Sequence, residues 1–311
     1  MSEPQPSPGV DGDAVDGARR RIVVFGDIAN DVVAVPKSVI RPDTDTTSTI
    51  RPRPGGSAAN TAAWLGSLGT PTDFIGSVGI ADVDYHIAEL RKQNVVPHLS
   101  IAPGLPTCTI VIIVEGEHRT MLTERGANRA LRAEDLSDEL LEEAVILHLT
   151  GYSLLDGPRA PGMLELIDRA HAAGVTVSIN PGSAGFIADF GPTEFLAGIV
   201  GADILFANAG EGALLCSETS AERMAQVLSE RHGLAVITQG ADSVFVAEAG
   251  GDPISVPVPP VRLVDPTGAG DAMAAGFLNS WIVERDMLKA AQAGVLVAAR
   301  AVMLMGGRPV I

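Results

Sequence analysis

The chain has 311 residues, 46% of them hydrophobic, and a formal net charge of −16. This composition can bury the core of one large domain, or of one domain with an appendage. The negative charge argues against a nucleic-acid partner, because phosphates would be repelled wherever no strong basic patch exists. No apolar run approaches the roughly 18 uncharged residues that span a bilayer. The N-terminus also lacks the apolar core of a signal peptide, so we expect a cytoplasmic protein without a membrane partner.

The first 20 residues are rich in Pro, Gly, Asp and Ser and have almost no large apolar side chains. Such a composition is typical of a disordered leader. Residues 21–25 form an apolar, β-branched run that predicts the first buried strand. We therefore place the folded domain at residues 21–311.

Polar residues follow this strand directly, in the stretch Gly26-Asp27-Ile28-Ala29-Asn30-Asp31. Open α/β sheets bind their ligands at the carboxyl ends of the strands. A short carboxylate there can accept hydrogen bonds from two adjacent hydroxyls of a polyol, and Asp31 is our candidate for that role. The alternative is an Asx turn, in which the side chain bonds its own backbone.

Two later stretches lack helical periodicity and predict a small second sheet, contributed by about residues 32–54 and 104–125. The second stretch reads as a hairpin with its turn at Glu115-Gly116-Glu117. A sheet that lies over a site as a lid excludes water and strengthens the electrostatics inside. Its exposed edge would also allow two copies to pair, so we expect a homodimer through the lid.

Gly55 and Gly56 precede an apolar segment with helical spacing, in the stretch Gly55-Gly56-Ser57-Ala58-Ala59-Asn60. Two glycines before a helix let the backbone touch a ligand, and Asn60 could add a side-chain hydrogen bond. A plain turn is the alternative.

Apolar strands at about residues 145–149, 175–179, 204–206 and 234–238 alternate with helical segments. This alternation predicts an α/β domain with a mostly parallel central sheet. Asn208 and Glu211, one helical turn apart after the third of these strands, could orient a hydrated Mg²⁺ through oxygen atoms. A helix N-cap with an acid at its third position explains the same pair.

The most informative stretch is Asp265-Pro266-Thr267-Gly268-Ala269-Gly270-Asp271, which precedes a run of small residues. Its glycines predict a tight turn that opens a helix, with backbone N–H groups directed at an anion. A carboxylate beside bound phosphate needs a chemical reason, and Asp271 fits a base that takes a proton from a nucleophilic hydroxyl. An ordinary helix N-terminus with Asp as the dipole partner is the alternative.

The string DPTGAGD resembles the signature of the ribokinase-like, or phosphofructokinase-B type, carbohydrate kinases, and GGSAAN resembles their N-terminal signature. The resemblance implies a three-layer sandwich with a β lid and a reaction that uses ATP and Mg²⁺. It assigns the catalytic base to Asp271, and the anion hole to Thr267, Gly268, Ala269 and Gly270. Sugar binding falls to Asp31, Gly55, Gly56 and Asn60, and ATP contacts to Thr238, Gly240, Thr267, Asn208 and Glu211. The resemblance further implies a monovalent cation such as K⁺, with Asp265 as its ligand.

We therefore expect an ATP-dependent kinase that phosphorylates a hydroxyl of a small sugar or sugar-like acceptor. A ribonucleoside kinase of the same fold is the first alternative, and a non-catalytic sugar or nucleotide sensor is the second. A Rossmann oxidoreductase is disfavoured, because no GxGxxG follows the first strand. The acceptor stays open, since Thr150 stands where true ribokinases carry a sugar-binding Glu.

Overall fold

A nine-stranded sheet forms the centre of the computed structural model, which describes residues 21–310 apart from 116–117 and 156–158. The leader predicted for residues 1–20 lies outside the described part. The strand order is β13-β12-β11-β10-β9-β8-β1-β4-β5, and neighbouring strands are parallel except at β11/β12 and β12/β13. The strands are β1 (Arg21–Phe25), β4 (Thr72–Val78), β5 (Val95–Ile101), β8 (Ala144–Thr150), β9 (Thr176–Asn180), β10 (Ile204–Asn208), β11 (Leu234–Gln239), β12 (Ser243–Glu248) and β13 (Ile254–Pro257).

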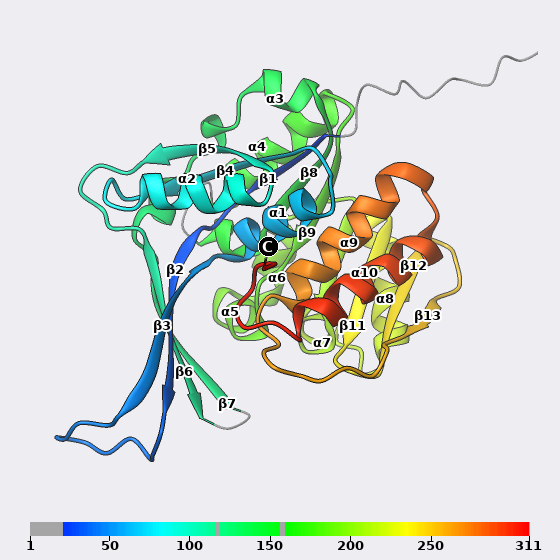
Figure 1. The fold of residues 1–311 in the computed structure, drawn as a ribbon. Helices are drawn as coiled ribbons and strands as arrows, with labels where there is room; N and C mark the ends of the chain where they lie inside the picture. Colours follow the sequence, from blue (N-terminus) through cyan, green and yellow to red (C-terminus); the bar gives the residue numbers. More distant parts are fainter. Residues whose placement is uncertain (1–20, 116–117, 156–158, 311) are drawn as a thin grey trace, which may run out of the picture.

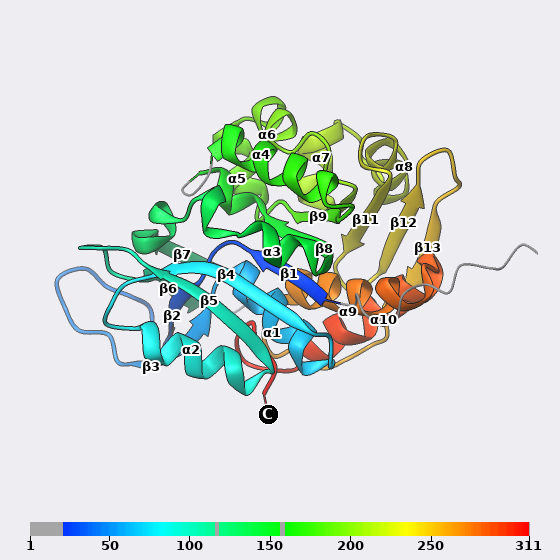
Figure 2. The same ribbon diagram turned by 90° about the horizontal axis from the view of Figure 1, so that it is seen from above.

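Helices cover both faces of this sheet, so the predicted three-layer sandwich is confirmed (Figures 1 and 2). Alternate residues of β1 show why: Val23 and Phe25 pack into one hydrophobic core, and Ile22 and Val24 pack into the other. The face of Ile22 carries α1 (Ser57–Ser67), α2 (Val83–Lys92), α9 (Ala269–Glu284) and α10 (Met287–Ala301). The other carries α3 (Asp138–Glu142), α4 (Arg159–Ala172), α5 (Ala184–Phe190), α6 (Pro192–Gly198), α7 (Ala209–Cys216) and α8 (Ala221–His232).

A separate four-stranded sheet projects from the body, as predicted (Figure 1). Its strands are β2 (Ala29–Pro36), β3 (Ser48–Gly55), β6 (Cys108–Glu115) and β7 (His118–Glu124), in the order β3-β2-β6-β7. The first strand begins at Ala29, closer to β1 than the expected residue 32. The turn expected at 115–117 falls largely on residues outside the described part. The connection from β1 into β2 is therefore short: Asp27 lies in it, and Asp31 follows near the start of β2, at the junction of the two sheets.

Two local features differ from the sequence expectation. The stretch before β8, to which the sequence analysis assigned no element, forms a 3₁₀ turn (Ala133–Asp135) and the short α3, which begins where Ser137 is extended and accepts a hydrogen bond from the Leu140 amide. The edge strand β5 was missed; it is mostly half-exposed and lacks the continuous apolar run of the buried strands. Short 3₁₀ turns also lie at Gly126–Ala130 and Gly151–Leu154.

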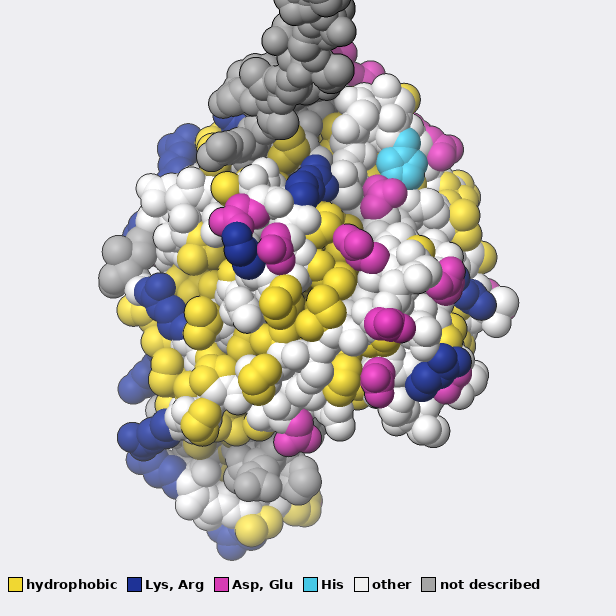
Figure 3. Space-filling view, turned by 90° about the vertical axis from the view of Figure 1, so that its right-hand side faces the viewer, with side chains coloured by type: hydrophobic (Ala, Val, Ile, Leu, Met, Phe, Trp, Pro, Cys, Tyr) yellow, Lys and Arg dark blue, Asp and Glu magenta, His cyan; other side chains and the backbone are white. Residues whose placement is uncertain are grey.

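The surface near α10, β12 and β13 faces the viewer in Figure 3. Hydrophobic side chains gather over the middle of this face, and acidic side chains are spread across it. None of the helices in the described residues is long and apolar enough to cross a membrane.

Candidate active site

A cleft of about 440 Å³ lies where the small sheet meets the carboxyl ends of the central strands. It gathers most of the residues singled out in the sequence, although they come from stretches more than 200 positions apart. Gly55 and Asp265 are the two candidates that do not line it. The predicted residues on its wall are Asp31, Gly56, Asn60, Asn208, Glu211, Thr238, Gly240, Thr267, Gly268, Ala269, Gly270 and Asp271.

Asp271 lies in the first turn of α9 with its side chain almost fully enclosed, at 8% exposure. The Ser57 hydroxyl donates a hydrogen bond of 2.6 Å to Oδ1, and Asn60 Nδ2 donates one of 3.0 Å to Oδ2. Burial raises the pKa of Asp271 to about 7, against these two hydrogen bonds, which lower it. A carboxyl group with that pKa can take up a proton at neutral pH, as a general base must.

The turn before α9 opens its helix without a side-chain cap. Its N-cap Gly268 is left-handed, with φ 76°, and a Cβ there would lie 2.6 Å from the Gly307 Cα, so only glycine fits. Two of the four amides predicted for the anion hole are bonded within the chain: Thr267 N–H to Asp265 Oδ1 (2.9 Å) and Ala269 N–H to the Pro266 carbonyl (3.2 Å). The Gly268 and Gly270 amides are therefore the better candidates for holding an anion.

Asp31 lies across the cleft with 5% exposure, and its Oδ1 has no hydrogen-bond partner within the described residues. Burial raises its pKa to about 7, although the nearby Arg308 guanidinium opposes the change. Gly55 packs against this side chain, since a Cβ would lie 2.2 Å from its carboxylate. Gly55 thus makes room for Asp31, in place of the ligand contact expected from the sequence. Ser153, another cleft residue, is 4% exposed and also has an unpartnered Oγ.

Asp27 was not chosen from the sequence, yet it organises the start of α1. Its carboxylate accepts hydrogen bonds from the amides of Ser57 (2.6 Å) and Ala58 (3.2 Å), and its Oδ1 also accepts one from the Thr150 hydroxyl (2.9 Å). Because Gly56 offers no side-chain cap, Asp27 caps α1 from the end of β1. This contact places the Ser57 hydroxyl against Asp271. The available signal was an acid directly after the first strand together with a Gly-Gly-Ser turn.

Asn208 and Glu211 form a reciprocal capping box at the start of α7, with both hydrogen bonds at 3.0 Å. The pair therefore forms the helix N-cap that the sequence offered as the alternative to a Mg²⁺ site. The Glu211 carboxylate nevertheless lines the cleft at 5% exposure, and burial raises its pKa to about 7. A carboxylate with that pKa would be stabilised by a cation, so the site fits Mg²⁺. The described residues contain no group of three or more His, Cys, Asp or Glu side chains that could hold a metal ion.

Asp265 does not present a vacant carboxylate to a monovalent cation. Its Oδ1 accepts from the Thr267 amide and its Oδ2 from the Gly306 amide, both at 2.9 Å. Burial acts to raise its pKa, but these amides and the Arg119 guanidinium, 3.4 Å from Oδ1, bring the pKa below its usual value. The arrangement around this side chain therefore does not fit the cation ligand expected from the sequence.

The segment Gly306–Arg308 supports the site from behind and was missed by sequence reasoning. Buried Arg308 donates from Nη2 to the Gly55 carbonyl (2.9 Å) and from Nε to Asn60 Oδ1 (3.4 Å). The Gly307 carbonyl accepts a hydrogen bond of 2.9 Å from the Trp64 indole. Arg308 thereby orients the Asn60 amide so that its Nδ2 faces Asp271.

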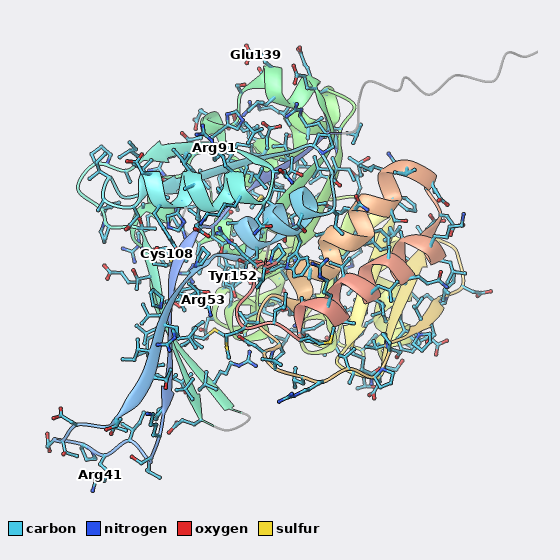
Figure 4. The ribbon with its side chains drawn as sticks, in the orientation of Figure 1. Arg41, Arg53, Arg91, Cys108, Glu139 and Tyr152 are labelled. Atoms are coloured by element: carbon cyan, nitrogen blue, oxygen red, sulfur yellow. The ribbon has the colours of Figure 1, made fainter. Side chains whose placement is uncertain are left out.

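The small sheet supplies an apolar wall to the cleft through Cys108, Ile110, Ile112 and Met121. In Figure 4, Arg41 lies at the far tip of this sheet, and Cys108 and Arg53 lie nearer the body. Tyr152 faces the cleft from the main body, with the Arg125 guanidinium 5.8 Å from its ring centroid. Arg125 is the one basic residue among the described residues of the cleft wall, beside the carboxylates of Asp27, Asp31, Glu211 and Asp271.

A buried carboxyl group with a raised pKa, lying in the first turn of a helix and facing a polar cleft, fits a phosphotransferase that acts on a hydroxyl group. The comparisons agree with this class. The chain belongs to the pfkB family of carbohydrate kinases, whose sequence profile matches residues 19–310.

Named relatives are kinases of sugars and nucleosides. The ATP-dependent ribose-1-phosphate kinase of Halopiger xanaduensis is 30% identical over 257 residues, which cover 79% of this chain and 80% of that protein. The structure of adenosine kinase from Sinorhizobium meliloti superposes with a TM-score of 0.84 at 26% identity, covering 94% of this chain and 97% of that one. Fructokinase from Xylella fastidiosa with bound ATP shares the fold, with a TM-score of 0.79 at 22% identity over 93% and 94% of the two chains.

Proposed function

We propose that this protein transfers the γ-phosphate of ATP to a hydroxyl of a small sugar or sugar-like acceptor. The observation that carries the proposal is the pairing, in one cleft, of the buried base Asp271 with the unpartnered acid Asp31. A buried polar atom without a partner is costly, so Asp31 Oδ1 is expected to accept a hydrogen bond from bound acceptor. The Ser153 hydroxyl, also unpartnered, offers a second contact to the same molecule.

In the proposed reaction Asp271 accepts the proton of the acceptor hydroxyl as that oxygen bonds to the γ-phosphorus. The bond between the γ-phosphorus and the bridging oxygen of ATP breaks, and ADP leaves. The Gly268 and Gly270 amides and the positive end of α9 stabilise the charge on the transferring group. Mg²⁺ would neutralise the phosphates, with Asn208 and Glu211 as the residues that orient its waters. Thr238 and Gly240, which line the same cleft, would contact ATP in this proposal.

A ribonucleoside acceptor is the second candidate, and the apolar wall of the small sheet favours it. Ile110, Ile112 and Met121 present hydrocarbon to the acceptor side of the cleft, where a flat base could bury its faces. The adenosine kinase of Sinorhizobium meliloti, similar to this chain at a TM-score of 0.84, is named for such an acceptor.

The test is ADP release from Mg²⁺-ATP with neutral sugars, phosphorylated or acidic sugars, and ribonucleosides, each against the Asp271→Asn variant. One acceptor class that raises ADP release in the wild type, with the signal lost in the variant, supports the proposal and selects the acceptor. Phosphorylated product is then identified by mass spectrometry. ATP and acceptor binding without turnover in any class would favour the non-catalytic sensor.

A further inference from the structure

Arg119, on β7 of the small sheet, contacts the phosphate-binding turn of the main body. Its Nη1 donates a hydrogen bond of 3.0 Å to the Thr267 hydroxyl and lies 3.4 Å from Asp265 Oδ1. Arg119 and Thr267 are 148 positions apart, and their contact joins the small sheet to the turn before α9. Arg119 and Asp265 do not line the main cleft; they line a small adjoining hollow that Asp31 and Thr267 also line.

The surroundings of Asp265 already contain a fixed positive charge. Asp265 is 8% exposed, each of its carboxylate oxygens accepts a hydrogen bond from a backbone amide, and the Arg119 guanidinium forms an ion pair with Oδ1. A monovalent cation bound to the same carboxylate would have to displace a donor, and it would lie close to the guanidinium charge. Like charges at a few ångströms repel strongly in a partly buried site. Arg119 and a K⁺ ion are therefore alternatives at Asp265.

We propose that Arg119 replaces a monovalent cation in this protein, acting as a positioning residue for the phosphate-binding turn. The inference rests on the proposed kinase function and adds to it that catalysis is independent of K⁺. The Asp265 carboxylate accepts from the Thr267 amide, so its charge and position fix the residue just before Gly268. Arg119 holds that carboxylate and the Thr267 hydroxyl together, and it does so from the small sheet.

The Arg119 guanidinium differs from a bound ion because it is attached to β7 and moves with that strand. An ion can reach the turn whatever the position of the small sheet, whereas Arg119 reaches it only when β7 is docked. Arg119 therefore couples docking of the small sheet to ordering of the phosphate-binding turn. We expect the loss of Arg119 to lower kcat more than it raises the KM for the acceptor, because its hydrogen bond and ion pair are with Thr267 and Asp265 of the turn rather than with Asp31.

The first experiment measures turnover in K⁺ and in tetramethylammonium at equal ionic strength, for wild type, Arg119→Met and Arg119→Lys. Wild-type rates should agree within about twofold in the two salts, since screening is matched. Arg119→Met should lose about tenfold or more in kcat without K⁺, the size expected for a hydrogen bond to a charged group. K⁺ should recover part of that loss, and Arg119→Lys should retain more activity than Arg119→Met in tetramethylammonium.

The matched control is Arg51→Met, because exposed Arg51 lies on β3 of the same sheet and bonds only its neighbour's carbonyl in the described contacts. It should behave as wild type in both salts. Strong activation of the wild type by K⁺ would overturn the proposal, and so would an Arg119→Met variant that matches wild type. A loss of kcat in Arg119→Met that K⁺ does not recover, together with an equal loss in Arg119→Lys, would also overturn it. Arg119 would then be only a packing contact.

A second readout needs neither ATP nor acceptor, so it stays informative if no acceptor is phosphorylated. Thermal unfolding midpoints are measured in the two salts at equal ionic strength. The wild-type midpoint should be the same in both, whereas K⁺ should raise the midpoint of Arg119→Met by binding the folded site. A K⁺-dependent rise in the wild type would contradict the inference even while the kinase function stands.

Discussion

Replacing Asp271 with Asn removes a buried charge and keeps the size and most of the hydrogen bonding of the side chain. The amide oxygen can still accept from Asn60, and the amide N–H can donate to the Ser57 hydroxyl, which is able to accept. Asn cannot take a proton from the acceptor, so we expect turnover to fall by about 10²- to 10⁴-fold, the range for a general base. ATP affinity should change little.

The same variant should be more stable than wild type in a pH-dependent way. With a pKa of about 7 in the folded protein and 3.8 ordinarily, Asp271 binds a proton on folding between these values. Its stabilising contribution is complete below pH 3.8 and is lost as pH rises through 7. Asn does not titrate, so its contribution does not depend on pH. The free energy of unfolding of the variant should therefore exceed that of wild type by about 4 kcal/mol at pH 8 and by about 1 to 2 kcal/mol at pH 5.

Urea unfolding at pH 8 and pH 5, with equal m-values for both proteins, measures these gains. The exposed Asp242→Asn is the matched control and should change neither stability nor turnover. A gain of equal size at the two pH values would refute the attribution to a buried charge. Unchanged turnover would refute the assignment of Asp271 as the base.

Three further substitutions test other parts of the site. Asp31→Asn should raise the acceptor KM by about 10- to 100-fold, because it weakens hydrogen bonds to a charged group. Steady-state kinetics measure this change, and the KM for ATP should stay the same. An unchanged acceptor KM would contradict the role of Asp31. Glu211→Gln should raise the Mg²⁺ concentration for half-maximal velocity, and an identical Mg²⁺ titration would argue against a metal role. Gly268→Ala should destabilise by about 1–3 kcal/mol in calorimetry through its left-handed backbone and close neighbour. Gly270→Ala, whose Cβ would meet open space, is its stability control and should leave the midpoint unchanged or raise it.

The layered fold was predictable because each buried strand is a short apolar run ended by a polar or glycine residue. The tight turn before α9 was predictable for a related reason: glycine suits the left-handed φ of Gly268, so the turn is visible in the residue types. Even there, the sequence could not show that the Thr267 and Ala269 amides are bonded within the loop. The Thr267 bond depends on where the Asp265 side chain turns, and the Ala269 bond depends on the backbone conformation at Pro266.

The second set of site residues carried no comparable signal. Ser57, Arg119 and Arg308 act through contacts with residues far along the chain, and nothing in their own neighbourhood has a periodic pattern. From the sequence alone, an arginine in a β-hairpin is expected to be solvent-exposed on the lid, and an arginine after Gly-Gly is expected to lie in a surface turn. Their roles depend on how the two sheets and α1 are packed together, which is a tertiary property.

The network around Asp271 has a consequence for how the protein acquires activity when it folds. Its hydrogen bonds span 211 and 214 residues, and those from Arg308 span 248 and 253. Contacts of such long range form late, because they must offset the entropy of closing very large loops. The β11–β12 hairpin can assemble from neighbouring residues, whereas the base and its partners meet only once both halves of the parallel sheet have joined. During refolding, recovery of turnover should therefore lag behind recovery of secondary structure.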